Sequence, residues 1–174
     1  MAHYAITAIG RDRPGIVAGL TGALRDLGCN LEDVSSTILR GHFTMMFVVD
    51  APAEAGEIQR ALTEAGEPLE VSVTVRDVEA GAPDRPEATH TLTVYGADRP
   101  GIVAGIAGLL AERGANITNL SCRIVGDEAP VYAMVAEVGL REGEDGADLT
   151  RAIEARAREL EVDATVRPIE VETL

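Results

Sequence analysis

The chain is built from two similar halves. The clearest copy is a ten-residue stretch, which reads GRDRPGIVAG from Gly10 and GADRPGIVAG from Gly96. The halves agree at the same offset of 86 positions as far as Ser35 and Ser121. Because matching sequences adopt matching folds, this internal repeat constrains the architecture more than any other feature does.

A short segment between the copies predicts where one domain ends and the next begins. Residues 79–88 read EAGAPDRPEA, a composition of Gly, Pro and charge that favours a linker over a regular element. We therefore predict one domain over 1–78, a linker over 79–88 and a second domain over 89–174. A domain of about 80 residues buries only about 60% of its unfolded surface, so we expect association, most simply as a homodimer.

Hydrophobic periodicity predicts the same elements in each copy. Apolar residues alternate from Tyr4 to Ala8, which indicates a strand. Val17, Leu20 and Leu24 then recur at helical spacing until Gly28 ends the helix. The remaining predicted elements are strands at 30–40 and 42–50, a helix at 53–65, a strand at 69–75, and in the second copy 90–95, 101–113, 116–125, 131–139, 147–160 and 162–169.

The element order βαββαβ predicts the fold class. Short crossover connections place both helices on one side of a four-stranded antiparallel sheet, which is the ferredoxin-like arrangement of an α+β protein. The strands at 42–50 and 131–139 are apolar on both faces. We therefore expect the twin domain or a second chain to cover the bare side of each sheet.

Charge excludes several classes of partner. The formal net charge is −14, and all 15 cationic residues are arginine. Direct nucleic-acid binding and binding to an anionic membrane both need cations, so neither is expected. The lack of lysine also excludes Schiff-base catalysis and phosphate loops that depend on lysine. With no membrane-length apolar run and no basic leader, we expect a cytoplasmic protein.

The repeated stretch predicts a pair of anion sites. It runs from a strand through a Gly/Pro turn into a helix, so unpaired backbone N–H groups at the helix start point toward one place. Pro14 and Pro100 suit the first helical turn and belong to the predicted site. The predicted donors are the N–H groups of Gly15, Ile16 and Val17 in the first copy and of Gly101, Ile102 and Val103 in the second.

The aspartate ahead of each turn, Asp12 or Asp98, supports two hypotheses. It can cap the helix by accepting from those N–H groups, in which case nothing need bind. Alternatively, it can face outward and bind an ammonium group. N–H groups that hold a carboxylate beside an aspartate that holds an ammonium would together select a free amino acid.

Asn30 and Asn116 follow the first helix of each copy and also allow two interpretations. Asparagine tolerates the left-handed conformation found at helix ends, which is a structural role. Its amide also offers a donor and an acceptor, which would suit a ligand.

Neither catalysis nor a metal site is predicted. His3, His42 and His90 lack the spacing of catalytic or metal-binding groups. Cys29 and Cys122 are expected to be buried apolar thiols with a structural role, and not a disulfide or a metal site. We therefore expect a protein that is not an enzyme and that uses no cofactor.

The motif around Asp12 and Pro14, together with Gly28-Cys29-Asn30, resembles the ACT domain, a βαββαβ regulatory module that binds amino acids at domain interfaces. Asp98, Pro100 and Asn116 match in the second copy. Two such domains resemble the group of the glycine cleavage system transcriptional repressor, and the resemblance spans nearly the whole chain.

The resemblance implies a ligand between domains, against the loop and the start of the first helix. Asp12 and Asp98 stand where serine-binding relatives have an asparagine, and Asn30 and Asn116 match a second ligand-binding asparagine. The aspartates would accept only the ammonium of the ligand. Arg11 has Ala97 as its counterpart, so the two sites need not be equivalent.

The function expected from this resemblance is regulatory. We expect the chain to bind a small amino acid, with glycine and serine as candidates, and to signal by changed domain packing in amino-acid metabolism or its transcriptional control. The alternative is a protein-interaction module without a ligand, which acts on a transcription factor or an enzyme.

Overall fold

The computed structural model divides the chain into two compact units, Met1–Gly81 and Ala82–Leu174. It describes residues 2–81, 87–126, 131–141, 143 and 145–169. The predicted linker at 79–88 lies partly outside these residues, so its bounds stay a prediction.

The first unit has the predicted order βαββαβ. Its elements are β1 (Ala2–Arg11), α1 (Ile16–Asp26), β2 (Asn30–Leu39), β3 (His42–Ala51), α2 (Ala55–Gly66), the 3-10 turn η1 (Glu67–Leu69) and β4 (Val71–Val78). The sheet order is β2-β3-β1-β4 and every pairing is antiparallel, so the ferredoxin-like fold is confirmed.

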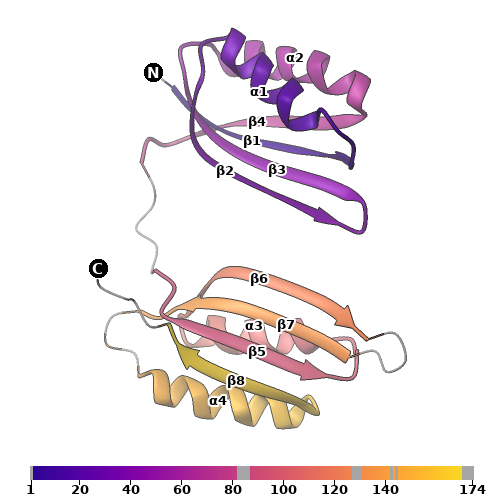
Figure 1. Cartoon of the computed structure of the whole chain (residues 1–174). Helices are drawn as coiled ribbons and strands as arrows, with labels where there is room; N and C mark the ends of the chain where they lie inside the picture. Colours follow the sequence, from indigo (N-terminus) through magenta and orange to yellow (C-terminus); the bar gives the residue numbers. More distant parts are fainter. Residues whose placement is uncertain (1, 82–86, 127–130, 142, 144, 170–174) are drawn as a thin grey trace. The chain divides into compact units, whose positions relative to one another are not determined.

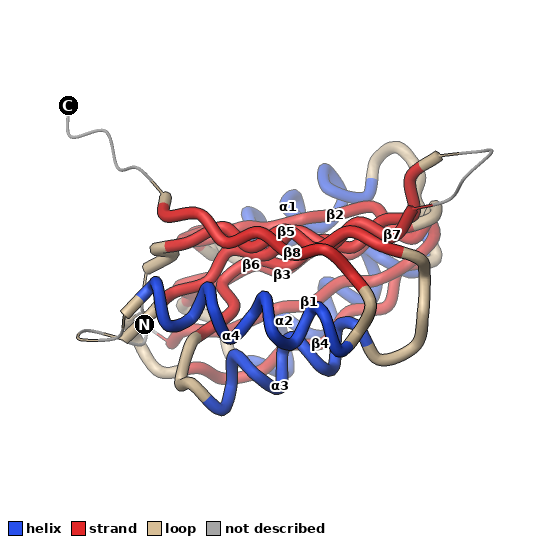
Figure 2. Tube along the Cα trace, turned by 90° about the horizontal axis from the view of Figure 1, so that it is seen from below, coloured by secondary structure: helices blue, strands red, loops and turns tan. Residues whose placement is uncertain are grey.

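The second unit repeats this arrangement. Its elements are β5 (His90–Gly96), α3 (Ile102–Glu112), β6 (Asn116–Val125), β7 (Val131–Gly139), α4 (Gly146–Glu159) and β8 (Val162–Pro168), with sheet order β6-β7-β5-β8. In each unit the two helices lie on one face of the sheet (Figure 1). Figure 2 shows the helices of each unit in blue against their red strands.

Each unit has a core of its own, made between its helices and the facing side of its sheet. In the first unit, Ile6 on β1 and Phe47 on β3 are register neighbours, and both are fully buried with Leu20 of α1. In the second, Val94 pairs with Met134 beneath Ile106 of α3. The other sheet face carries exposed apolar side chains, among them Met46, Tyr95 and Val135.

Several predicted boundaries differ from the structure; the second helix, for example, begins at Ala55 instead of 53. Three of the differences have a clear cause in the backbone. Pro14 precedes α1 rather than joining its first turn, and Gly101 precedes α3, because the residue that caps each helix is a left-handed glycine that cannot be helical. The last strand of the first unit begins at Val71 instead of 69, since Glu67–Leu69 form a 3-10 turn and Glu70 follows in a left-handed conformation.

Candidate functional site

The loop between the first strand and the first helix has the same geometry in both units. Gly15 (φ 98°) and Gly101 (φ 99°) turn the backbone in the left-handed region and form the N-caps of α1 and α3. Glycine reaches this conformation without the steric cost of a Cβ. The turn therefore sets the direction in which each helix starts.

The N-terminus of α1 presents free backbone donors. The first helical hydrogen bond runs from the Gly19 N–H to the Gly15 carbonyl at 2.8 Å. The N–H groups of Ile16, Val17 and Ala18 come before it, and no side chain in the described part of the chain caps the helix. α3 begins in the same way, with the Gly105 N–H donating to the Gly101 carbonyl at 2.8 Å. Both loops thus keep the geometry of an anion site.

The capping hypothesis for the two aspartates is wrong. Asp12 and Asp98 lie three residues ahead of the glycine N-caps, and neither side chain accepts a hydrogen bond from the helix start. The Asp12 backbone N–H instead donates to the Gly41 carbonyl at 2.9 Å, which ties the loop to the β2–β3 turn. Both aspartate residues are exposed. Their carboxylates are therefore left to face solvent or a ligand.

The other predicted loop residues contribute in different ways. The side chains of Ile16 and Ile102 belong to the two cores, so each can offer a ligand only its backbone N–H. Val17 is 45% exposed, whereas Val103 is half-buried. Pro14 and Pro100 are exposed beside the turn.

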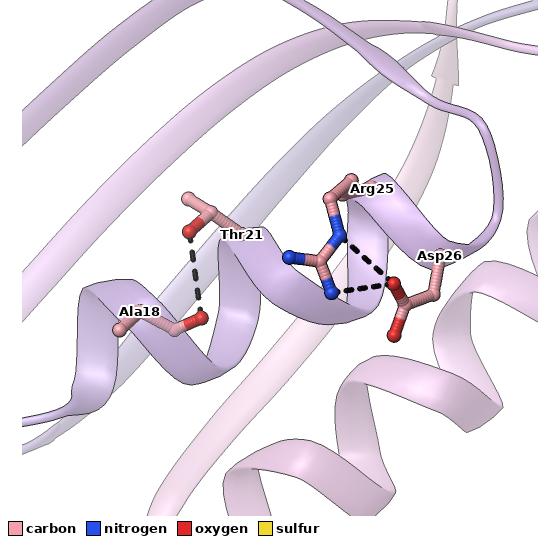
Figure 3. Close-up of polar contacts among 4 residues, drawn as sticks. All are labelled: Ala18, Thr21, Arg25 and Asp26. Carbon is pink, nitrogen blue, oxygen red and sulfur yellow. Dashed lines mark hydrogen bonds and ion pairs between the residues drawn. The ribbon is translucent and has the colours of Figure 1, made fainter.

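Polar side chains farther along α1 are already engaged. The Thr21 hydroxyl donates to the Val17 carbonyl at 2.8 Å and approaches the Ala18 carbonyl at 3.5 Å. Arg25 forms a salt bridge of 2.6 Å with Asp26, as Figure 3 shows. The candidate site is consequently restricted to the first turn of the helix and the loop before it.

Two glycines of the repeated motif serve packing rather than binding. A Cβ on Gly10 would lie 2.6 Å from the Glu70 carbonyl oxygen, because β1 passes close to the start of β4. A Cβ on Gly19 would lie 3.1 Å from Leu69, and one on its counterpart Gly105 would lie 3.0 Å from Leu160. Close packing thus explains part of the motif without any ligand.

Sequence reasoning missed the role of the motif's repeated arginine. Arg13 forms a salt bridge with Glu70, and Arg99 forms one with Glu161. Both glutamates have φ 54° and follow the second helix of their unit, so the loop of each unit is held by the same kind of contact. The signal was present in the sequence, since Arg13 and Arg99 are repeat partners, but their acidic partners are separated by 91 positions instead of 86.

We expect Arg99→Gln to lower the free energy of unfolding by less than about 1 kcal/mol, since the paired side chains are largely exposed. Urea unfolding in low and in high salt measures this, and the difference from wild type should shrink in high salt. A loss of several kcal/mol would contradict this prediction.

The structure separates Asn30 and Asn116 from the loops of their own units. Asn30 pairs with Asp50, which in turn pairs with His3 near the start of β1, whereas Asp12 follows the end of β1. Nine residues of strand span about 30 Å. Asn116 and Asp98 are separated in the same way along β5. Therefore no single amino acid can touch both members of such a pair within one domain.

Hydrogen bonds explain why each asparagine lies just after a helix. The Gly28 N–H donates to the Arg25 carbonyl at 2.9 Å, and the Cys29 N–H donates to the Leu24 carbonyl at 3.0 Å. This is a Schellman motif, with Gly28 in the left-handed conformation. The second unit repeats it at Gly114, so both asparagines are the first residues of a strand and their side chains are not needed to end the helix.

The surroundings of Asn30 are acidic. The Oδ1 atom of Asp50 is buried, and the described residues provide no hydrogen-bond partner for it. The Glu32 Oε2 atom lies 3.2 Å from the His3 Nδ1 atom, which is hydrogen-bond distance. At the matching positions of the second unit stand Gly139 and Thr118. The two asparagines therefore lie in different electrostatic environments.

Cys29 does not have the surroundings of an activated thiol. It packs against the first core, and burial, followed by the charges of Asp50 and Glu57, raises its pKa. A raised pKa keeps sulfur in the weakly nucleophilic thiol form. Cys122 packs against the second core. Both cysteines are free, as predicted, but they are only partly buried and not fully buried.

The described residues contain no cluster of three histidine, cysteine or acidic side chains arranged to hold a metal ion. Within the same residues, no helix is both long and apolar enough to span a membrane.

Comparisons with known proteins agree with the tandem architecture. A UPF0237 protein from Methanopyrus kandleri is 43% identical over 79 residues, which is 44% of this chain and 88% of that relative. The crystal structure of an unknown protein from Galdieria sulphuraria has a TM-score of 0.80 and 26% identity, and the match covers 97% of this chain and 99% of that one. A proposed glycine cleavage system transcriptional repressor has the same fold, with a TM-score of 0.76, 20% identity and coverage of 98% of both chains.

Family models match both units. One ACT-domain model matches residues 3–76, and a second matches residues 90–158. Neither describes a catalytic domain. The chain therefore belongs to the ACT-domain family and consists of two ACT domains in tandem.

Proposed function

We propose that this chain is a non-catalytic cytoplasmic regulator that binds a small amino acid at ACT-domain interfaces and signals by changed domain packing. The observation that carries the proposal is the helix start in each unit, where backbone N–H groups have no capping side chain and an exposed aspartate stands nearby. The family match supports a regulatory, ligand-binding role.

The chemistry of the loop suits a zwitterion. The N–H groups of Ile102 and Val103 and the partial positive charge of the helix start would stabilise the ligand's carboxylate. The Asp98 carboxylate is exposed and would accept from the ligand's ammonium group. Both ends of a free amino acid thus have a partner of opposite charge in one loop.

A second ACT domain would complete the site. Since Asn116 lies at the far end of its own sheet from Asp98, an asparagine that reaches the same ligand must come from another domain. A ligand held by two domains favours the arrangement in which both contacts form. The ligand shifts the equilibrium between the two arrangements by the difference between its binding free energies for them.

The downstream step would run through a protein. With a net charge of −14, the chain is unsuited to hold DNA itself, so an effect on transcription would need a partner that binds DNA. Similarity to a proposed glycine cleavage system repressor makes glycine and serine the first ligands to test.

The first experiment is a thermal-shift screen of the full chain against the twenty amino acids, followed by calorimetry on each hit. A ligand that binds the folded state must raise the melting temperature by mass action. We expect a selective rise for one or a few small amino acids. The proposal fails if none of the twenty shifts the protein at millimolar concentration.

We expect Asp98→Ala to weaken binding of the identified amino acid about tenfold or more and to leave the fold intact. A charge-assisted hydrogen bond is worth about 1.5–3 kcal/mol, and each 1.4 kcal/mol is a factor of ten. Asn116→Ala should act in the same direction. Calorimetry gives the dissociation constants, and circular dichroism checks the fold.

The matched control for Asp98→Ala is Asp163→Ala. Asp163 is also exposed, but it lies on β8 opposite Tyr95, on the sheet face away from the helices. It removes the same charge from the same unit, so its affinity should equal that of wild type. An unchanged dissociation constant in both Asp98→Ala and Asn116→Ala would contradict the site assignment.

One observation favours a second candidate function, a protein-interaction module without a ligand. β2 is an edge strand exposed along its whole length, and it carries the apolar side chains of Leu31, Val34 and Ile38. An exposed apolar edge is typical of a protein interface. This alternative predicts that no amino acid binds and that a protein partner contacts β2.

A further inference from the structure

The second unit carries a pair of polar side chains next to its loop that the first unit lacks. Tyr132 of β7 pairs with Gly96, the last residue of β5 before the loop. Cys122 of β6 is the diagonal neighbour of Tyr132 on the same side of the sheet, which is the side of the buried Met134 and therefore of the helices. The pair thus lies at the end of the sheet where the loop to α3 begins.

Strand register identifies the counterparts in the first unit. Gly10 pairs with Phe43 as Gly96 pairs with Tyr132, so Phe43 is the counterpart of Tyr132. Ser36 precedes Cys122 by the repeat offset of 86 positions and pairs with Met45. The first unit consequently has a phenyl ring where the second has a phenol, and a hydroxyl where the second has a thiol.

Tyr132 and Cys122 are diagonal neighbours on this side of the sheet, and both residues are half-buried. Burial is the largest cause that raises the pKa of Tyr132 to about 12, followed by the neighbouring Cys122 and the charge of Asp98. The phenol therefore stays protonated at neutral pH. A protonated phenol has one donor and two acceptor positions, so it can bond to a ligand as a donor or as an acceptor.

In the proposed ligand orientation, only the ligand's side chain is left to contact Tyr132 and Cys122. The helix N–H groups would take the carboxylate, and Asp98 would take the ammonium. The remaining substituent of the α-carbon is the ligand's side chain. Because Tyr132 pairs with Gly96, the residue that opens the loop, its hydroxyl is a candidate partner for that side chain.

We propose that Tyr132 and Cys122 make the second unit's site selective for an amino acid with a short hydroxyl or carboxamide side chain. The first unit, with Phe43 and Ser36, does not make this selection. The inference rests on the proposed function. A site built to hydrogen-bond a hydroxyl discriminates strongly against the analogue that lacks it, since its own polar groups are then left unpaired. Serine and alanine differ by one hydroxyl and are the decisive pair of probes.

Each test variant introduces the residue that the other unit already uses. In the full chain, Tyr132→Phe removes the phenol hydroxyl, and Cys122→Ser replaces the thiol with the hydroxyl of the first unit, each with little change in shape. The matched control is Tyr95→Phe, which removes a phenol hydroxyl from the same unit, on the exposed sheet face away from the helices. Circular dichroism and the melting temperature show whether each variant is folded.

Calorimetry with serine and with alanine on wild type and the three variants tests the inference. We expect wild type to bind serine more tightly than alanine. Tyr132→Phe should lower the affinity for serine about tenfold and leave the affinity for alanine unchanged. Cys122→Ser should lower the preference for serine by less, and Tyr95→Phe should change neither affinity. Wild type that binds amino acids without favouring serine, or a serine preference that survives in folded Tyr132→Phe and Cys122→Ser, would overturn this inference alone. Wild type that binds no amino acid would overturn the proposed function as well.

Discussion

Gly10→Ala is expected to lower the free energy of unfolding by about 3 kcal/mol, which is the upper part of the usual range for overpacking. The added methyl would lie 2.6 Å from the Glu70 carbonyl oxygen, 2.9 Å from a Val71 methyl and 3.0 Å from the Val71 Cα. Two of these atoms belong to the backbone, so no side-chain rotation relieves the clash. β1 and β4 would have to separate, and β1 is a central strand of its sheet.

Chemical unfolding of Gly10→Ala beside Gly22→Ala checks this prediction. Gly22 lies inside α1, and a Cβ there meets nothing within 4 Å. Alanine is the better helix former by about 0.5–1 kcal/mol, so Gly22→Ala should stabilise the protein. A Gly→Ala substitution is therefore expected to lower the free energy of unfolding at one position of this unit and to raise it at another. Equal stability of Gly10→Ala and wild type would contradict the close approach of the two strands.

Phe47→Ala is expected to be the most damaging core substitution in the first unit, with a loss of about 3–5 kcal/mol. Phe47 is fully buried on β3 and lies between Ile6 of β1 and Val34 of β2. A small domain has little stability to spare, so we expect this unit to be largely unfolded. The core of the second unit is drawn from its own residues and should survive.

Residue-resolved hydrogen exchange tests both parts of the Phe47→Ala prediction. Amides of β1 and β3 should lose their protection, while those of β5 and β7 keep it. Met46→Ala is the control, because Met46 is the neighbouring residue but is 48% exposed on the other sheet face. Loss of protection in both units at once would show that the two cores unfold as one.

The sequence predicted the fold well because its strongest signals are local and occur twice. The helical spacing of Leu20 and Leu24, with Gly28 after them, was enough to place the first helix. Arg40 and Gly41 both have positive φ, which is the two-residue turn that the predicted hairpin requires. The errors lay at boundaries, where a left-handed residue such as Gly15 or Glu70 decides the last turn and periodicity carries no information.

The candidate site was less accessible to sequence reasoning, because it depends on contacts between distant residues. The partnership of Arg13 with Glu70 joins residues 57 positions apart, and no spacing rule indicates it. Asn30 follows Asp12 closely in sequence, yet the strand register places them at opposite ends of the sheet. Only the loop and the helix start after it could be predicted from their residues, and the structure was needed to show that no aspartate side chain caps the helix.

The counterpart of Tyr132 in the first unit follows from the strand register and not from the constant sequence offset. At the constant offset of 86 positions its partner would be Met46, whose side chain is on the opposite sheet face from Phe43. The hairpin of the second unit holds three additional residues, so the true offset beyond it is 89 positions, as Gly139 and Asp50 show. The strand pairings, and not the sequence alone, reveal which side chains occupy matching places.

The separate cores of the two units allow the two copies of the repeat to diverge in sequence. Each core is drawn from the residues of its own unit, so a substitution in one core removes no side chain from the other. After a duplication, the two copies of one fold can therefore accumulate different side chains inside a single polypeptide. Phe43 and Ser36 in the first unit, against Tyr132 and Cys122 in the second, are one such difference at matching places of the two sheets.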